Sequence, residues 1–172
     1  MKHTPIFMPV ILAVLLTAIT LYRPPVSQSS ANAVDGSSKY MQSVQTALRD
    51  AKTFGIFKFP KPCEKCNGAN LTVQDFPDLP PVTPLSAADA SFFVTTLSDP
   101  ASYVLGGLQK AMPFIADYGL LLEGAGERRL LLISTYAQSV KLITSDKDGG
   151  VLIGNVDPIF PKVKERLGNI FR

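Results

Sequence analysis

The first 25 residues constrain this chain more than any other part of it. Lys2 and His3 precede an uncharged apolar run of 17 residues, from Ile6 to Tyr22, which ends at Arg23 and two prolines. A helix of that length is at the short end of what spans a hydrocarbon core about 30 Å thick. It is also longer than the apolar core of about 7–15 residues in a secretory signal peptide. Both interpretations deliver the chain to a membrane, so we expect the residues after Pro25 to lie outside the cytoplasm.

Retention and cleavage of this segment remain alternatives. Cleavage would use Ala31 and Ala33, which form an A-x-A site. Retention needs only an apolar helix, and Pro5 and Pro9 fall in its first turns, where proline is tolerated. We favour a single-pass signal-anchor with a cytoplasmic N-terminus; a secreted or periplasmic protein, cut at Ala33, is the alternative. The residues expected to contact lipid are Ile6, Val10, Ile11, Leu12, Val14, Leu15, Leu16, Ile19, Leu21 and Tyr22.

The charge of the chain gives no reason to expect a nucleic-acid partner. The formal net charge of +3 includes Lys2 and Arg23, and no acidic residue precedes Asp35. The remaining residues therefore carry 17 − 2 = 15 basic and 14 acidic side chains, a net charge of +1. Binding to a phosphate backbone needs a cluster of positive charge. We expect the membrane and other envelope proteins as partners, and no nucleic acid.

The pattern after the apolar run predicts a tether and one domain. Residues 26–38 are rich in Ser, Ala, Asn and Gly, which is typical of a flexible tether. Residues 39–172 then form the expected extracytoplasmic domain, beginning with a helix from Ser38 onward in which apolar residues recur every three or four positions. Residues 60–84 contain six prolines and both cysteines, so we expect a long ordered loop.

The second half of the chain predicts an α+β fold. Ser86 followed by Asp89 is a helix-start signal, and Asp99 followed by Pro100 is another. Four runs rich in Leu, Ile and Val follow at 118–123, 128–135, 139–144 and 151–156, separated by glycine-containing turns. Residues 162–171 have the pattern of an amphipathic helix with Lys162, Lys164 and Arg166 on its outward face. We therefore expect helices packed on a four-stranded antiparallel meander, with a C-terminal helix.

Cys63 and Cys66 form the one motif with an associated chemistry. In an oxidising compartment a C-x-x-C pair forms a disulfide by default. A redox-active pair is an alternative, since Lys58, Lys61 and Lys65 would favour a thiolate. A metal half-site is a third reading, but four ligands are usual for zinc, and Asp75, Asp78 or a second chain would have to supply the others.

The residue inventory predicts no catalytic site and no cofactor or metal. The one histidine is His3, so a Ser-His-Asp or Cys-His arrangement within the domain is excluded. The acidic pairs Asp75 with Asp78, Asp146 with Asp148, and Glu123 with Glu127 all fall in expected loops or turns. Acidic residues there are expected to be solvated and to lack the shifted pKa that catalysis needs.

Three segments of the domain carry a resemblance. Residues 97–103 (LSDPASY), 110–113 (KAMP) and 129–133 (RLLLI) resemble small exported bacterial proteins of uncharacterised function. Members of that group often have cysteines near the positions of Ala111 and Ile133, which this chain lacks. The resemblance implies export and a small α+β domain, and it implies no activity.

Three functions are compatible with these observations. The first is a non-catalytic, membrane-tethered subunit of a cell-envelope complex that acts through protein–protein contacts. The second is a membrane-anchored protein that exchanges disulfides or handles metal through Cys63 and Cys66. The third is a self-assembling, pilus-like structural subunit, although Pro24 and Pro25 would interrupt the continuous helix that such packing requires. We favour the first.

Overall fold

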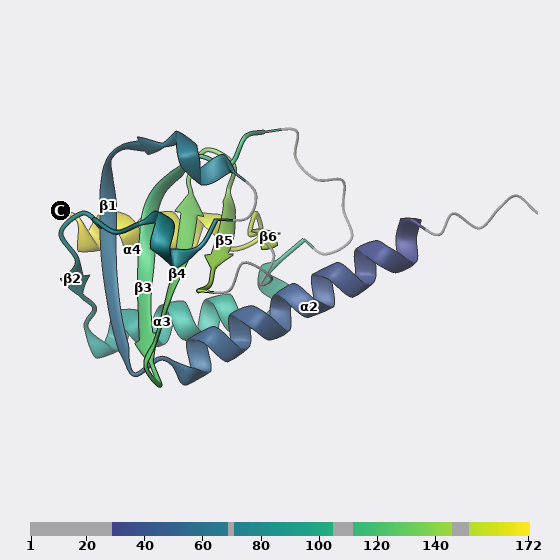
Figure 1. The fold of residues 1–172 in the computed structure, drawn as a ribbon, viewed down its shortest axis with the longest axis horizontal. Coiled ribbons are helices and arrows are strands. Elements are labelled where there is room, and N and C mark those ends of the chain that lie inside the picture. Colours follow the sequence, from purple (N-terminus) through teal and green to yellow (C-terminus); the bar gives the residue numbers. More distant parts are fainter. Residues whose placement is uncertain (1–28, 69–70, 105–111, 146–151) are drawn as a thin grey trace, which may run out of the picture.

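The protein folds as an α+β domain in which helices cover one face of an antiparallel sheet (Figure 1). The structure is a computed structural model that describes residues 29–68, 71–104, 112–145 and 152–172, with side chains from Lys39 on and excluding residues 152 and 153. The apolar run from Ile6 to Tyr22 lies outside the described residues. Within them, no helix is both long and apolar enough to cross a bilayer. The expected α+β class and antiparallel sheet are confirmed.

Within the described residues the sheet has six strands, so the expected number of four was wrong. The strands are β1 (Thr53–Cys63), β2 (Thr83–Pro84), β3 (Ala116–Gly124), β4 (Glu127–Ser134), β5 (Ser139–Ile143) and β6 (Leu152–Asn155). Their order is β2-β1-β3-β4-β5-β6, with every neighbouring pair antiparallel. The two additional strands come from the aromatic segment around Phe54 and from the last residues of the proline-rich stretch. Proline removes a backbone donor but does not prevent pairing at the edge of a sheet, where β2 lies.

A two-residue turn joins β3 to β4. Gly124 pairs with Glu127, and the two residues between them, Ala125 and Gly126, have φ angles of 52° and 79°. Positive φ at both central positions is the geometry that matches the right-handed twist of a hairpin. The second expected turn, at residues 146–150, lies outside the described residues.

Three α-helices pack against the same face of the sheet. They are α2 (Ser29–Asp50), α3 (Ala87–Ser98) and α4 (Phe160–Ile170). α2 and α3 lie side by side, and Gln45 of α2 donates from Nε2 to the Ser98 carbonyl at the end of α3 at 2.9 Å (Figure 1). The core between helices and sheet includes Val44, Leu48, Phe93, Leu97, Leu120, Leu122, Leu131, Ile133, Val140, Leu142, Val163 and Leu167.

Helix α2 begins at Ser29, earlier than the expected start at Ser38. Residues 29–38, expected as an irregular tether, belong to this helix, and Ala31 and Ala33 lie in it. Its N-terminal turns extend beyond the sheet (Figure 1). The segment contains four serines and a glycine, weak helix formers, which is why composition alone indicated a linker.

The region after α3 differs from the expected second helix. Ser86 caps α3 by accepting from the Asp89 amide at 3.1 Å, as its position predicted. Asp99 accepts from the Ala101 amide, but only a single 3₁₀ turn, Pro100–Ser102, follows. Val104 and Met112 are 44% and 40% exposed. Residues 105–111 lie outside the described residues.

Arg166 on α4 was expected to face solvent, and it instead joins two helices. Its Nη1 lies 3.1 Å from Oδ1 of Asp89 on α3, and its guanidinium lies 4.7 Å from the centre of the Phe92 ring. Lys162 and Lys164 on the same helix are exposed, as expected.

The opposite face of the sheet carries a second apolar layer, covered by the proline-rich segment (residues 60–84) rather than by an α-helix. Phe57 of β1 lies at its centre, directly over Gly119 of β3. A Cβ at residue 119 would collide with the Phe57 ring, so the close approach of the ring to the backbone requires glycine. The buried members of this layer are Phe57, Cys63, Cys66, Val73, Phe76, Phe114, Ala116, Leu130, Leu132 and Ile143.

This close approach gives a direct test of the second layer. We expect Gly119→Ala to lower the free energy of unfolding by about 1–3 kcal/mol, the usual cost of overpacking a core. Gly168→Ala is the matched control, because a Cβ at that position in α4 meets no atom within 4 Å. The control should be neutral or stabilising by up to about 1 kcal/mol. Urea denaturation measures both, and equal effects would contradict the packing of Phe57 on Gly119.

Candidate functional site

The cysteine pair lies at the end of β1, beneath the proline-rich segment. Cys63 is the last residue of β1, and Cys66 lies in the 3₁₀ helix η1 (Glu64–Asn67). The two form a disulfide with their Cα atoms 5.4 Å apart. Cys63 is 9% exposed and Cys66 is fully buried. The two cysteines therefore differ in burial, and Cys63 is the more exposed residue.

A register shift in β1 explains how the chain reaches the cysteine pair. β1 pairs with β3 from Thr53 to Lys58, after which the register shifts until Cys63 pairs with Ala116. Pro60 and Pro62 fall within this irregular stretch, where their missing amide donors cost no ladder hydrogen bond. The shift lets the strand end in the tight turn that the C-x-x-C spacing needs.

A buried lysine holds the turn that follows. Lys141 of β5 is 0% exposed, and its Nζ donates to the carbonyls of Cys66, at 2.5 Å, and Gly68, at 2.8 Å. The ammonium also lies 5.4 Å from the centre of the Phe114 ring. The structure shows no salt bridge for Lys141 within the described residues. Two carbonyl dipoles and one aromatic face thus replace the water and counter-ion that an ammonium normally has.

Burial lowers the pKa of Lys141 to about 8. The cause is loss of solvation, which disfavours the charged form of a lysine. Sequence reasoning missed this residue because Lys141 lies in a strand that was assigned from its apolar residues. The available signal was the period of the strand: residue 141 must share a face with Ile143, which is buried.

Three further contacts hold the disulfide loop (residues 63–68) in place. The Phe114 amide donates to Oδ1 of Asn67 at 3.0 Å. Lys65 donates from Nζ to the Asp75 carbonyl at 2.9 Å, and its ammonium lies 4.6 Å from the centre of the Phe76 ring. The loop is therefore linked to the start of β3 and to the second 3₁₀ helix, η2 (Val73–Asp75).

η2 is itself docked on the sheet. Its first residue, Val73, donates its amide to the Thr144 carbonyl at 3.1 Å. Asp75 accepts through Oδ2 from the amide and the hydroxyl of Thr72, at 2.7 and 3.0 Å, which caps the turn. This use of the carboxylate is structural, as in the capping box of a longer helix.

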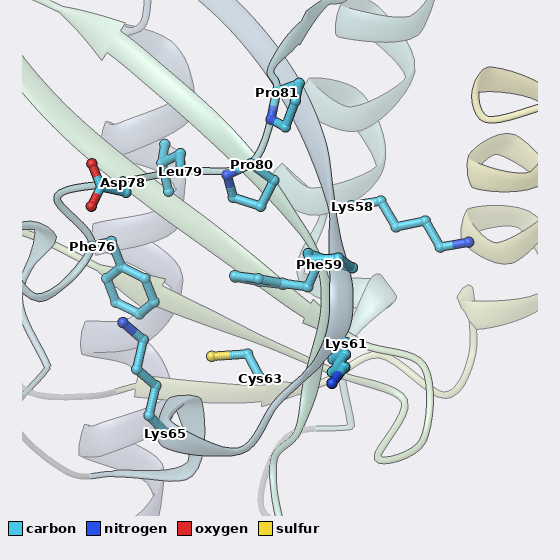
Figure 2. A pocket seen from close by; sticks show the side chains of 11 residues that line it. Lys58, Phe59, Lys61, Cys63, Lys65, Phe76, Asp78, Leu79, Pro80 and Pro81 are labelled. Atoms are coloured by element: carbon cyan, nitrogen blue, oxygen red, sulfur yellow. The ribbon is translucent and has the colours of Figure 1, made fainter.

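A groove runs between the second half of β1 and the proline-rich segment. It encloses about 700 Å³, within the range of small-ligand sites. Figure 2 shows Phe59, Phe76 and the 79–81 stretch around it, with the sulfur of Cys63 and the ammonium of Lys65 at one end. Its lining residues are Lys58, Phe59, Pro60, Lys61, Cys63, Lys65, Phe76, Asp78, Leu79, Pro80 and Pro81. An apolar wall thus meets Lys61, Lys65 and one aspartate, whereas the Lys58 side chain points away, over the Tyr118 ring (Figure 2).

The described acidic residues that were considered as metal ligands or catalytic pairs each have a different environment. Asp75 caps η2, whereas Asp78 lines the groove. Glu123 accepts from the Thr53 hydroxyl and Glu127 pairs with Arg129. Asp146 and Asp148 lie outside the described residues. In the part of the chain that the structure describes, no three His, Cys, Asp or Glu side chains gather as a metal site.

Comparison with models of protein families, with curated proteins and with solved structures gives no match. The resemblance of residues 97–103, 110–113 and 129–133 to small exported proteins stays a prediction. The function of this protein must therefore be argued from the geometry of the groove and the disulfide loop.

The buried ammonium predicts a pH dependence of stability. Lys141 has a folded-state pKa of about 8 against 10.5 for the free side chain, so between these values the unfolded chain binds more protons. The free energy of unfolding then rises with pH across this window. We expect wild type to gain on the order of 2 kcal/mol relative to Lys141→Met between pH 7 and pH 9.5.

Urea denaturation of both proteins at each pH measures this difference. The buried tyrosines Tyr40 and Tyr103, whose pKa values burial raises, are present in both proteins and cancel in the comparison. A difference that stays constant with pH would contradict a buried, charged Lys141.

Proposed function

We propose that this protein is a non-catalytic, single-pass membrane subunit of a cell-envelope complex, and that its groove binds an extended segment of a partner protein. The observation that carries the proposal is the groove itself. It lies over the second apolar layer, on the face of the sheet opposite the three helices. The tether rests on the apolar run from Ile6 to Tyr22.

The lining of the groove favours an acidic and apolar segment as the occupant. Lys61, Lys65 and Asp78 line it, so its local charge is positive although the domain is close to neutral. Phe59, Leu79 and Pro80 are partly exposed and offer apolar contact. Charge complementarity of this kind directs a partner to one site, and burial of apolar side chains supplies affinity.

Supporting contacts make the groove wall rigid before any partner binds. Lys65 is fixed by the Asp75 carbonyl and the Phe76 ring, while Phe57 and Phe59 meet edge-to-face with ring centres 5.2 Å apart. A preformed wall loses little conformational entropy on binding. The fold thus supports binding at the groove better than at Tyr136, which is 59% exposed.

A photo-crosslinking side chain tests the docking surface. It is placed at Lys61 in the groove or, as matched control, at Lys164 on α4; both lysines are exposed, and the two lie on opposite faces of the sheet. In native membranes, position 61 should give a discrete protein adduct that position 164 does not. The charge reversal Lys61→Glu should lower recovery of that adduct partner at least threefold, and Lys164→Glu should not. Identical adducts from both positions would contradict the groove as the contact site.

The tether has an independent test. We expect the intact mass of the protein extracted from membranes to include residues 1–33. It should also remain in the membrane fraction after an alkaline wash, because the apolar run stays in the bilayer. A mass that corresponds to a chain beginning after Ala33 would contradict the anchor and leave a released protein, without bearing on the groove.

A further inference from the structure

The disulfide and the groove lie together, and this juxtaposition goes beyond a contact surface. Cys63 lines the groove, whereas Cys66 is fully buried behind it. Figure 2 shows the Cys63 side chain pointing toward Lys65 and Phe76.

We propose that Cys63 and Cys66 form a thiol–disulfide exchange pair whose substrate is a cysteine side chain of a partner protein, presented in an acidic or apolar segment that occupies the groove. The partner thiolate attacks the Cys63 sulfur and forms a mixed disulfide with it. The Cys63–Cys66 bond breaks, and its electron pair leaves on Cys66 as a thiolate, which takes up a proton. A second thiolate of the same partner then displaces Cys63. The partner dithiol is oxidised by two electrons and this pair is reduced by two.

Three features of the site match these roles. Cys63, which lines the groove and is the more exposed of the two cysteines, carries the sulfur that must be attacked, because exchange proceeds by direct approach of a thiolate. Lys61 and Lys65 surround that approach with positive charge, which attracts a thiolate. The Lys141 ammonium donates to the backbone carbonyl of Cys66, the residue that carries the leaving thiolate.

The loop should also keep its shape when the disulfide opens. The Cys66 and Gly68 carbonyls remain bonded to Lys141, and the Asn67 side chain remains bonded to the Phe114 amide. None of these contacts involves a sulfur atom. The two thiols would therefore stay close together and could re-form the bond, which a reversible exchange requires.

Single-cysteine variants of the full chain test the assigned order. Cys66→Ser leaves the Cys63 thiol and Cys63→Ser leaves the Cys66 thiol. With glutathione disulfide under native conditions, the Cys63 thiol should form a mixed disulfide at least tenfold faster than the Cys66 thiol, and this ratio should fall toward one in denaturant. Equal rates in the native protein, or faster reaction of Cys66, would overturn the proposal.

Wild-type protein gives the same information without a cysteine substitution, should either variant fail to fold. A brief, limiting pulse of an alkylating reagent on the dithiol-reduced protein should label Cys63 in preference to Cys66, as read by peptide mass spectrometry. Dithiothreitol should also open the wild-type disulfide much faster than the protein unfolds. Opening only at the rate of global unfolding would make the bond purely structural.

A peptide comparison tests the positive charge around Cys63. A cysteine peptide flanked by Asp and Glu should attack wild type at least threefold faster than the same peptide flanked by Lys, and Lys61→Glu should remove that preference. No preference would contradict the acidic substrate class. These tests use no partner protein, so their result is independent of the crosslinking experiment.

Discussion

The disulfide face of this protein depends on one buried amine. Lys141 brings a positive charge into the layer between the sheet and the proline-rich segment, and there it binds two backbone carbonyls rather than a carboxylate. An isolated buried ammonium is costly, so its hydrogen bonds must be made well. They can be made only if the disulfide loop lies directly over β5. The free-energy cost of burying the ammonium therefore favours one position of the disulfide loop.

The two faces of the sheet are stabilised in different ways. On the helical face, aliphatic and aromatic side chains interlock in the usual manner of helix on sheet, and large side chains such as Leu48 and Phe93 are fully buried. On the other face a segment with few backbone hydrogen bonds must be held by specific contacts: Lys141 to the disulfide loop, Asn67 to Phe114, and Lys65 to η2. The groove lies between this segment and the second half of β1.

The sequence predicted the parts of the fold that arise from local pattern. Runs rich in Leu, Ile and Val placed β3, β4 and β5, and the Ser86 cap placed the start of α3. Strands β1 and β2 were not predicted as part of the sheet. Their pairing joins residues far apart in the chain, and the prolines in and near them argued against strand pairing. The role of Lys141 needed knowledge of what covers residue 141, which the period of a strand cannot supply. The sequence identified the cysteine pair, but only the structure shows that Cys66 is more deeply buried than Cys63.

The central claim is that Lys141 fixes the disulfide loop on the sheet, and native-state amide hydrogen exchange tests it most directly. Wild type is compared with Lys141→Met at neutral pH. The account predicts that protection falls in residues 63–76 while the amides of α3, α4 and the β3–β4 hairpin keep theirs, because local opening of the loop does not require the helical layer to open. Unchanged protection in the loop, or a uniform loss across the whole domain, would contradict it.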